Sequence, residues 1–281
     1  MRVLSIQSQT VLGHVGNSIA AFAMQRLGVE TLAVPTLVYS NHPGYGAHRG
    51  RAFAGEEIDA LVAGVEEQGA LAGCDAVLSG YLAERSTGEA VLRAIGRVRT
   101  ANPNAFYCCD PVLGDAPKGL YVPKELAEFI RDRLVAESEV LTPNCFELGW
   151  LTGQSVKTPA TIFAAARPLT AGKPRFVLVT SVPTSDRTIG LMLVTPDGGW
   201  ATTTPKRIFQ RPPHGGGDLT AAVFLAQLLR TQDPVAALAA TAGAVYAVFA
   251  ATQSSEGELA LITAQNALAS PPTSYPVERI A

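Results

Sequence analysis

The sequence His214-Gly215-Gly216-Gly217-Asp218 leads directly into the apolar segment Leu219–Leu229. Glycines at a helix start leave backbone N–H groups free to converge on an anion, and the helix dipole adds partial positive charge there. A carboxylate beside a bound anion is repelled by it, so Asp218 needs a chemical reason to be there. A hydroxyl that accepts a phosphoryl group needs a base to take its proton, and Asp218 can be that base. The stretch therefore predicts a phosphoryl-transfer site. Gly-Gly-Asp also forms ordinary turns, and Asp is a common helix N-cap.

The composition is typical of a large globular domain. The chain has 281 residues, 47% of them hydrophobic, with a mean hydropathy of +0.19, so it has enough apolar surface for a sizeable core. A formal net charge of −2 and a pI near 6.1 provide no basic surface for nucleic acid. The alanine-rich run Val235–Ala251 lacks flanking positive charge and predicts a buried helix rather than a membrane span. We expect neither a nucleic-acid nor a membrane partner.

The four cysteines, Cys74, Cys108, Cys109 and Cys145, have no CxxC spacing, and no secretory leader precedes them. This pattern favours reduced thiols and a cytoplasmic location. Cys108 and Cys109 are adjacent in a strand-like run, so their side chains are expected on opposite faces of a sheet. We interpret Cys108 and Cys109 as small buried hydrophobic residues.

Strand-like and helix-like segments alternate along the chain. Apolar runs predict strands at Arg2–Gln7, Thr31–Val38, Asp75–Ser79, Phe106–Cys109, Glu139–Leu141, Phe176–Thr180 and Leu191–Thr195. Helical spacing predicts helices at Ser18–Leu27, around Ile58–Val65, at Val91–Val98 and, with Pro123 as its first residue, at Lys124–Val135. The C-terminal third is expected to be mostly helical. Alternation of this kind predicts an α/β fold with a parallel sheet covered on both faces, and no linker divides residues 1–281 into more than one domain.

Ligands of parallel sheets bind at the carboxyl ends of the strands. Ser8, Tyr81, Asp110 and Asn144 each follow a predicted strand end by one to three residues, so they are candidate site residues. The loop Asp110–Pro123 is rich in proline and glycine and is long enough to act as a flap.

Two common nucleotide-binding motifs are absent from the sequence. It contains no GxxxxGK[ST] loop and no GxGxxG after its first strand, which disfavours P-loop kinases and Rossmann dehydrogenases. Asp110 and Glu147 instead follow predicted strands, and Mg²⁺ keeps most of its waters, so one or two carboxylates beside a nucleotide are enough to hold it. Each acid taken alone is more often a helix cap or a solvated residue. Together with the glycine loop they favour phosphoryl transfer.

A set of short motifs, in order along the chain, resembles the pyridoxal kinases of the ribokinase-like superfamily. The motifs are Ile6-Gln7-Ser8, Gly13-His14-Val15-Gly16-Asn17, Tyr39-Ser40-Asn41-His42, Leu78-Ser79-Gly80-Tyr81-Leu82, Asp110-Pro111-Val112-Leu113-Gly114, Asn144-Cys145-Phe146-Glu147 and the glycine loop. The similarity extends to the tail around Glu258–Gln265. The resemblance implies a three-layer αβα sandwich with a central, mostly parallel sheet, and a homodimer.

The same resemblance implies an ATP-dependent kinase that phosphorylates the 5′-hydroxymethyl group of pyridoxal in vitamin B6 salvage, with Mg²⁺ as cofactor. Asp218 matches the catalytic base, and Gly215, Gly216 and Gly217 match the anion hole for the transferring phosphoryl group.

The remaining site residues are also implied by the family pattern. Asp110 and Glu147 match acids that organise Mg²⁺ and the nucleotide phosphates, with Asn144 in support. Thr142 and Thr180 fall at nucleotide-binding positions. The substrate-binding positions are those of Ser8, Pro43, Gly44, Tyr81 and Asp218.

Several positions depart from that pattern. Pro43 stands where a hydroxyl-bearing residue is common, Gly216 where threonine is usual, Thr180 where relatives often have lysine, and His214 where asparagine or a small apolar residue is usual. Pro43 keeps open a kinase for another small alcohol, such as a hydroxymethylpyrimidine. Thr180 and the altered glycine loop keep open a vitamer-binding protein with weak activity.

Overall fold

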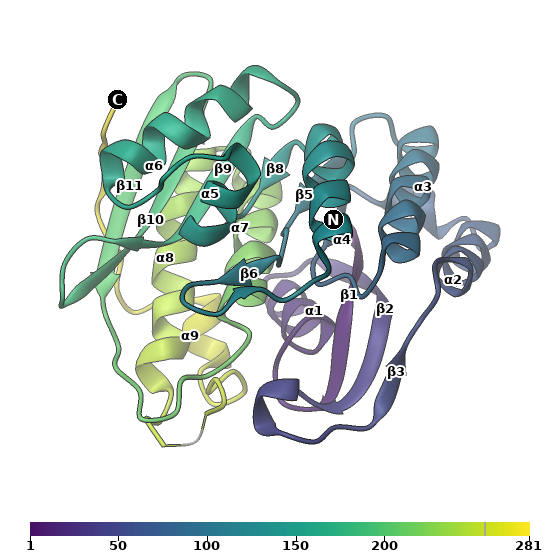
Figure 1. The fold of residues 1–281 in the computed structure, drawn as a ribbon, viewed down its shortest axis with the longest axis horizontal. Helices are drawn as coiled ribbons and strands as arrows, with labels where there is room; N and C mark the ends of the chain where they lie inside the picture. Colours follow the sequence, from purple (N-terminus) through teal and green to yellow (C-terminus); the bar gives the residue numbers. More distant parts are fainter. Residues whose placement is uncertain (256) are drawn as a thin grey trace.

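A ten-stranded sheet runs through the middle of the protein, in the order β12-β11-β10-β9-β8-β5-β4-β1-β2-β3 (Figure 1). The structure is a computed structural model and describes residues 1–255 and 257–281. The strands of the sheet are β1 Arg2–Leu12, β2 Glu30–Asn41, β3 Gly50–Ala52, β4 Ala76–Ser79, β5 Phe106–Cys109, β8 Val140–Leu141, β9 Phe176–Pro183, β10 Thr188–Thr195, β11 Gly198–Pro205 and β12 Val277–Arg279. A separate hairpin pairs β6 Gly114–Asp115 with β7 Gly119–Leu120, within the loop interpreted as a flap.

Six neighbouring strands, β2, β1, β4, β5, β8 and β9, are parallel. The connections between these parallel strands cross over the sheet, as parallel pairing requires, whereas β9 turns directly into antiparallel β10. Antiparallel strands flank this block, with β3 at one edge and β10, β11 and β12 at the other. The prediction of a mostly parallel sheet is confirmed.

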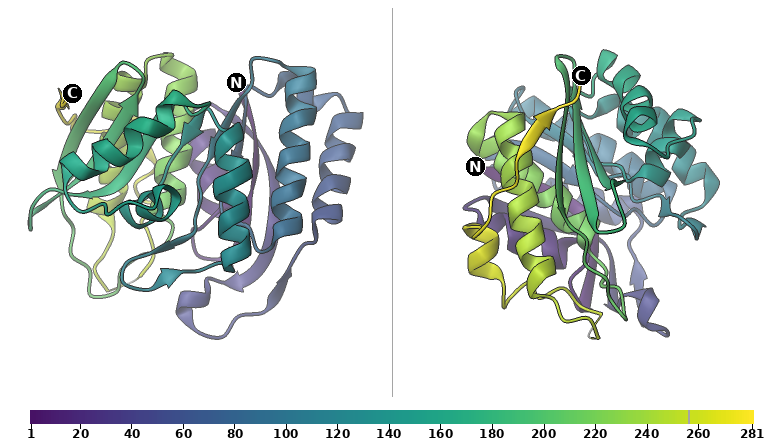
Figure 2. Two further views of the ribbon diagram at one scale, coloured as in Figure 1. Left: turned by 45° about the horizontal axis from the view of Figure 1, so that its top comes forward. Right: turned by 90° about the vertical axis from the view of Figure 1, so that its left-hand side faces the viewer.

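Helices cover both faces of the sheet and make three layers, which Figure 2 shows from two sides. One face carries α2 Gly55–Glu67, α3 Arg85–Ala101, α4 Lys124–Phe129, α5 Cys145–Thr152 and α6 Pro159–Ala166. The other carries α1 Asn17–Arg26, α7 Gly216–Thr231, α8 Pro234–Ala251 and α9 Gln265–Ala269. Cys108 packs in the second core and Cys109 in the first, so the prediction that they face opposite sides is confirmed.

The expectation that the C-terminal third is mostly helical is wrong at β11 and β12. A two-residue turn, Pro196 and Asp197, joins Thr195 to Gly198, where φ is 146°, and folds β11 back on β10. An Asp-Gly pair between two extended runs is a hairpin signal that the sequence contains. One helix boundary also shifts, because Pro123 is the N-cap of α4 and not its first residue.

Helix α8 is long and apolar enough to cross a membrane by length and composition alone. In the structure it packs on α7 and on the antiparallel strands β10 and β11, and its side chains Leu238 and Val248 are fully buried. These contacts agree with the prediction of a buried helix.

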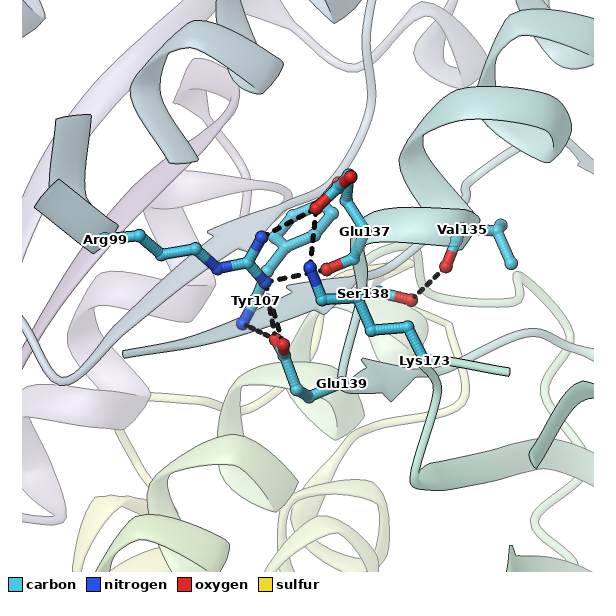
Figure 3. Close-up of polar contacts among 7 residues, drawn as sticks. All are labelled: Arg99, Tyr107, Val135, Glu137, Ser138, Glu139 and Lys173. Atoms are coloured by element: carbon cyan, nitrogen blue, oxygen red, sulfur yellow. Dashed lines mark hydrogen bonds and ion pairs between the residues drawn. The ribbon is translucent and has the colours of Figure 1, made fainter. Parts of the chain in front are cut away.

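A network of ion pairs fastens the amino-terminal ends of β5 and β8 (Figure 3). Arg99, in the last turn of α3, contacts Glu137 and Glu139, each at 2.8 Å, and Lys173 contacts Glu137 at 2.7 Å. Glu139 also accepts a hydrogen bond from the backbone N–H of Tyr107 at 2.7 Å. Since Glu139 directly precedes β8 and Tyr107 lies in β5, the network links α3 to both strands.

Candidate active site

Asp218 lies in the first turn of α7 but does not cap that helix. The N-cap is Gly215, with φ of 87° and no side-chain cap. The Asp218 carboxylate instead accepts a hydrogen bond at 3.0 Å from the backbone N–H of Gly16, the residue before α1. Burial raises the pKa of Asp218, and the Gly16 bond works against the rise. The N-cap alternative for Asp218 is therefore wrong.

Packing explains two of the three glycines in the loop before Asp218. A Cβ atom on Gly215 would lie 2.0 Å from the backbone oxygen of His14, and one on Gly216 would lie 2.8 Å from the ring of Phe249. A Cβ on Gly217 would enter open space. The loop is thus held tightly on two sides, and Gly217 is exposed at the start of α7.

Asp110 directly follows β5, at the same edge of the sheet. Its pKa is raised well above the usual value, first by burial and then by the negative charges of Glu147 and Asp218. Thr142 follows β8 beside it, and its buried hydroxyl acts on the Asp110 carboxylate, against the rise in the pKa of Asp110. Three acids and a hydroxyl therefore share one region, and oxygen groups of this kind suit a hard cation such as Mg²⁺.

Glu147 forms a capping box at the start of α5. Its carboxylate accepts a hydrogen bond from Asn144 N at 2.8 Å, and the Asn144 side chain accepts one from Glu147 N at 3.0 Å. The other oxygen of Glu147 accepts from Leu113 N at 2.8 Å, and the Asn144 amide donates to the Gly114 carbonyl at 2.8 Å. Burial raises the pKa of Glu147 to about 7 although these hydrogen bonds oppose the rise. Glu147 and Asn144 thus hold the base of the flap.

Thr180 lies next to this capping box, within β9. Its backbone N–H donates to the Pro143 carbonyl at 2.9 Å, and it forms a parallel bridge with Asn144. The thiol of Cys145 points to the Thr180 carbonyl at 3.9 Å and is partly exposed, whereas Cys108 and Cys109 are buried as predicted. The nucleotide candidates Thr142, Thr180 and Glu147 therefore come together at neighbouring strand ends.

Ser8 and Tyr81 belong to the substrate side of the site. Ser8 does not follow β1, as expected, but lies inside it, where the pairing with β2 shifts register between Gln7 and Gln9. The Ser8 carbonyl lies 2.0 Å from where a Cβ on Gly16 would be, so Ser8 contacts the residue that donates to Asp218. Tyr81 follows β4 as predicted, and burial raises the pKa of its half-buried hydroxyl.

Pro43 and Gly44 lie in a short 3-10 turn, Pro43–Tyr45, that packs on the glycine loop. His42 caps the turn by accepting a hydrogen bond from Gly44 N at 3.0 Å. The ring of His42 stacks on that of His214, with centroids 3.9 Å apart, and a Cβ on Gly44 would lie 2.5 Å from the His214 ring. The structure therefore brings these two substrate candidates to the start of α7.

The comparisons with known proteins agree with this geometry. Residues 23–259 match the phosphomethylpyrimidine kinase family. The chain is 43% identical to pyridoxal kinase PdxY of Rubrobacter xylanophilus, over 100% of this chain and 98% of that protein. It is 42% identical to pyridoxal kinase PdxY of Leifsonia xyli subsp. xyli, over 100% of both.

The chain belongs to the pyridoxal kinase family.

A solved pyridoxal kinase has the same fold. The pyridoxal kinase from Leishmania donovani in complex with ADP and pyridoxamine superposes with a TM-score of 0.91 at 27% identity, over 100% of this chain and 99% of that one. The expected ribokinase-like αβα sandwich of the pyridoxal kinase family is confirmed.

Three further residues beside the site were missed as functional candidates. Glu258 contacts His14 from the β1–α1 turn and Tyr45 from the turn that covers the glycine loop. Tyr45 and His14 lay within or next to the family motifs, whereas no local pattern marks Glu258, because its partners are far away in the sequence.

The site does not contain a ready-made protein cage for a metal. Within residues 1–255 and 257–281, no group of three or more His, Cys, Asp or Glu side chains is placed to hold one ion. Members of the pyridoxal kinase family bind a nucleotide, whose phosphates supply oxygen ligands, so a cation that keeps its waters needs only one or two carboxylates from the protein.

Proposed function

We infer that this protein transfers the γ-phosphoryl group of ATP to the 5′-hydroxymethyl group of pyridoxal and so forms pyridoxal 5′-phosphate. The full-length similarity to pyridoxal kinases carries the choice of reaction. The observation that carries the mechanism is the hydrogen bond from Gly16 to Asp218, which leaves the carboxylate at the start of α7 free of any capping role.

Asp218 is the proposed general base. It takes the proton of the acceptor hydroxyl as the oxygen attacks the γ-phosphorus in line with the leaving ADP. A partly buried carboxylate with a raised pKa is a stronger proton acceptor than a fully solvated one, which favours this role. The Gly16 N–H fixes the direction of the carboxylate.

The glycine loop is the proposed anion hole. Backbone N–H groups at the α7 N-terminus face the developing charge on the transferring phosphoryl group, and the helix dipole adds to their effect. Gly217 borders open space and so allows close approach, whereas Gly215 and Gly216 allow the loop to pack against His14 and Phe249.

Asp110 is the acid proposed to hold the metal, with the Thr142 hydroxyl beside it. Mg²⁺, when bound, neutralises charge on the nucleotide phosphates and lowers the repulsion among the site acids. Both oxygens of Glu147 accept backbone hydrogen bonds, so we propose that Glu147 acts mainly by holding the flap base. Thr180 is proposed to line the nucleotide site next to it.

Ser8, Tyr81, Pro43 and Gly44 are the proposed contacts of the pyridine ring. Tyr81 offers a flat aromatic surface, and the Pro43–Tyr45 turn covers the glycine loop. The homodimer and the cytoplasmic location stay predictions.

A single assay tests the function. Purified protein is mixed with Mg-ATP and, separately, with pyridoxal, pyridoxine, pyridoxamine or hydroxymethylpyrimidine, and phosphorylated product and ligand binding are both measured. We expect the highest kcat/KM with a B6 vitamer. Preference for hydroxymethylpyrimidine would support the second candidate, which the family match at residues 23–259 and Pro43 favour. Binding of vitamer without turnover would contradict both kinase assignments.

A further inference from the structure

Glu258 joins the turn that covers the glycine loop to the C-terminal part of the chain. The hydroxyl of Tyr45 donates a hydrogen bond to the carboxylate of Glu258, and the Gly257 carbonyl lies 3.0 Å from the same hydroxyl oxygen. The guanidinium of Arg211 lies 5.1 Å from the centre of the Tyr45 ring, on the same side of the site. Tyr45 is thus held at its hydroxyl and on its ring face, which fixes the position of the whole Pro43–Tyr45 turn.

The same carboxylate also contacts the turn between β1 and α1. One oxygen of Glu258 accepts a hydrogen bond from His14 N at 3.3 Å and lies 3.6 Å from the His14 ring nitrogen Nδ1. The other oxygen lies 2.6 Å from where a Cβ on Gly13 would be. Glu258 therefore packs against the backbone of this turn and not only against its side chains.

This β1–α1 turn continues to the proposed catalytic groups. The His14 carbonyl packs against the α-carbon of Gly215, at the start of the glycine loop. Two residues later, Gly16 donates the hydrogen bond that orients Asp218. A continuous set of contacts thus runs from Tyr45 through Glu258 and the β1–α1 turn to the base and the anion hole.

We propose that Glu258 is a positioning residue for phosphoryl transfer. It fixes the Pro43–Tyr45 turn over the substrate and, with the same carboxylate, fixes the β1–α1 turn that orients Asp218. One side chain then positions both the Pro43–Tyr45 turn, which covers the substrate, and Asp218. The turn therefore encloses the substrate only when Asp218 is correctly oriented. The proposal rests on the proposed function and adds to it a residue that touches neither substrate nor nucleotide.

Kinetics of three variants test the proposal. Tyr45→Phe removes only the hydroxyl that holds the cover, so we expect KM for pyridoxal to rise about two- to tenfold with kcat kept. Glu258→Ala releases the cover and the β1–α1 turn together, so KM should rise similarly and kcat should fall about tenfold or more, because small misplacement of a catalytic group is costly. Glu258→Gln keeps an acceptor oxygen for His14 N and should recover most of kcat. KM for ATP should stay unchanged in all three.

A double variant and a surface control complete the experiment. In Glu258→Ala, the further change Tyr45→Phe should add little to KM, since the two residues act as one contact. Glu89→Gln alters an exposed ion pair on α3 and should behave as wild type. Melting temperatures are recorded for every variant. A Glu258→Ala protein with wild-type kcat and KM, whatever its melting temperature, or fully additive KM effects, would overturn the proposal.

Turnover of pyridoxal by the wild-type protein is measured first in the same assay. Its absence would contradict the proposed function, whereas normal wild-type turnover with unaffected variants would contradict only the role of Glu258.

Discussion

Carboxylates at the amino end of the parallel sheet are paired with cations, whereas those at its carboxyl end are not. At the amino end, Glu137 and Glu139 share Arg99, and Lys173 adds a second cation to Glu137 (Figure 3). The pKa of Glu137 is lowered, first by Lys173. At the carboxyl end, the three acids of the site take part in none of the ion pairs formed by the described residues, and the pKa of each is raised by burial.

This difference indicates that the acids at the amino end serve stability, whereas those at the carboxyl end serve the reaction. At the amino end, Arg99 and Lys173 neutralise Glu137 and Glu139, and these ion pairs hold α3 to the sheet. Acids without a cation, such as the buried Asp110 and the partly buried Asp218, are unfavourable for the folded state alone, and their clustering is typical of functional sites. We therefore expect changes at the carboxyl end to alter activity with little loss of stability, and changes at the amino end to do the reverse.

Asp218→Asn should have the largest effect on activity. The amide cannot take the proton of the acceptor hydroxyl, so kcat should fall at least about 10²-fold. The Asn oxygen still accepts from Gly16 and avoids burying a charge, so the melting temperature should stay the same or rise. The matched control is Asp233→Asn, because Asp233 does cap a helix, α8, and Asn caps about as well. Unchanged turnover in Asp218→Asn would refute the base.

Arg99→Leu should mainly lower stability. It leaves the partly buried Glu139 without its cation, which should cost about 1–3 kcal/mol in the free energy of unfolding. Denaturant melts measure this cost, with Arg93→Leu as control, because Arg93 pairs with Asp59 at the surface, where such pairs contribute little. We expect kcat per folded molecule to stay at the wild-type value. A large loss of kcat would show that the two ends are not separate.

Glu147→Gln should lower kcat about tenfold and raise the Mg²⁺ concentration needed for half-maximal activity. The amide NH₂ cannot accept a hydrogen bond, so either Asn144 N or Leu113 N loses its acceptor and the flap base loosens. KM for pyridoxal should hardly change. Titration of activity with Mg²⁺ measures the effect, with the exposed Glu89→Gln as control, and normal metal dependence would contradict the assignment.

Pro43→Thr should have a smaller effect, on substrate binding by the Pro43–Tyr45 turn. A hydroxyl there offers the pyridine ring one more hydrogen bond, which should lower KM for pyridoxal about two- to tenfold. Steady-state kinetics with each vitamer measure the change. If KM stays constant or rises, Pro43 serves instead as a backbone constraint at the first position of its 3-10 turn.

His42 should make a small, pH-dependent contribution to stability. Burial, followed by the charges of His214, Lys118 and His48, lowers the pKa of His42 from 6.5 to about 4. As pH falls, His42 takes up a proton in the unfolded chain at a higher pH than in the folded protein. The contribution of His42 to the free energy of unfolding is therefore fully present above about pH 6.5 and is lost as pH falls toward 4. Melting temperatures across this window should fall less steeply in His42→Asn, which keeps a cap for Gly44 N. Identical slopes would contradict the shift.

The match between sequence and structure was best where the information is local. Apolar runs and helical spacing located the parallel strands and most helices, because each pattern depends on residues a few positions apart. The capping box of Asn144 and Glu147 is equally local, although we did not predict it from the sequence. The Asp197-Gly198 pair at the β10–β11 hairpin is also local, and we did not predict β11 from it.

Tertiary structure decided how the acids and the cover of the site are used. The hydrogen bond between Gly16 and Asp218 joins residues 202 positions apart, and that between Tyr45 and Glu258 joins residues 213 apart. The sequence determined that Asp218 stands at a glycine-rich helix start, and family motifs suggested its role. Only the packed chain excludes an N-cap there, because the backbone N–H that the carboxylate binds comes from Gly16, far away in the sequence.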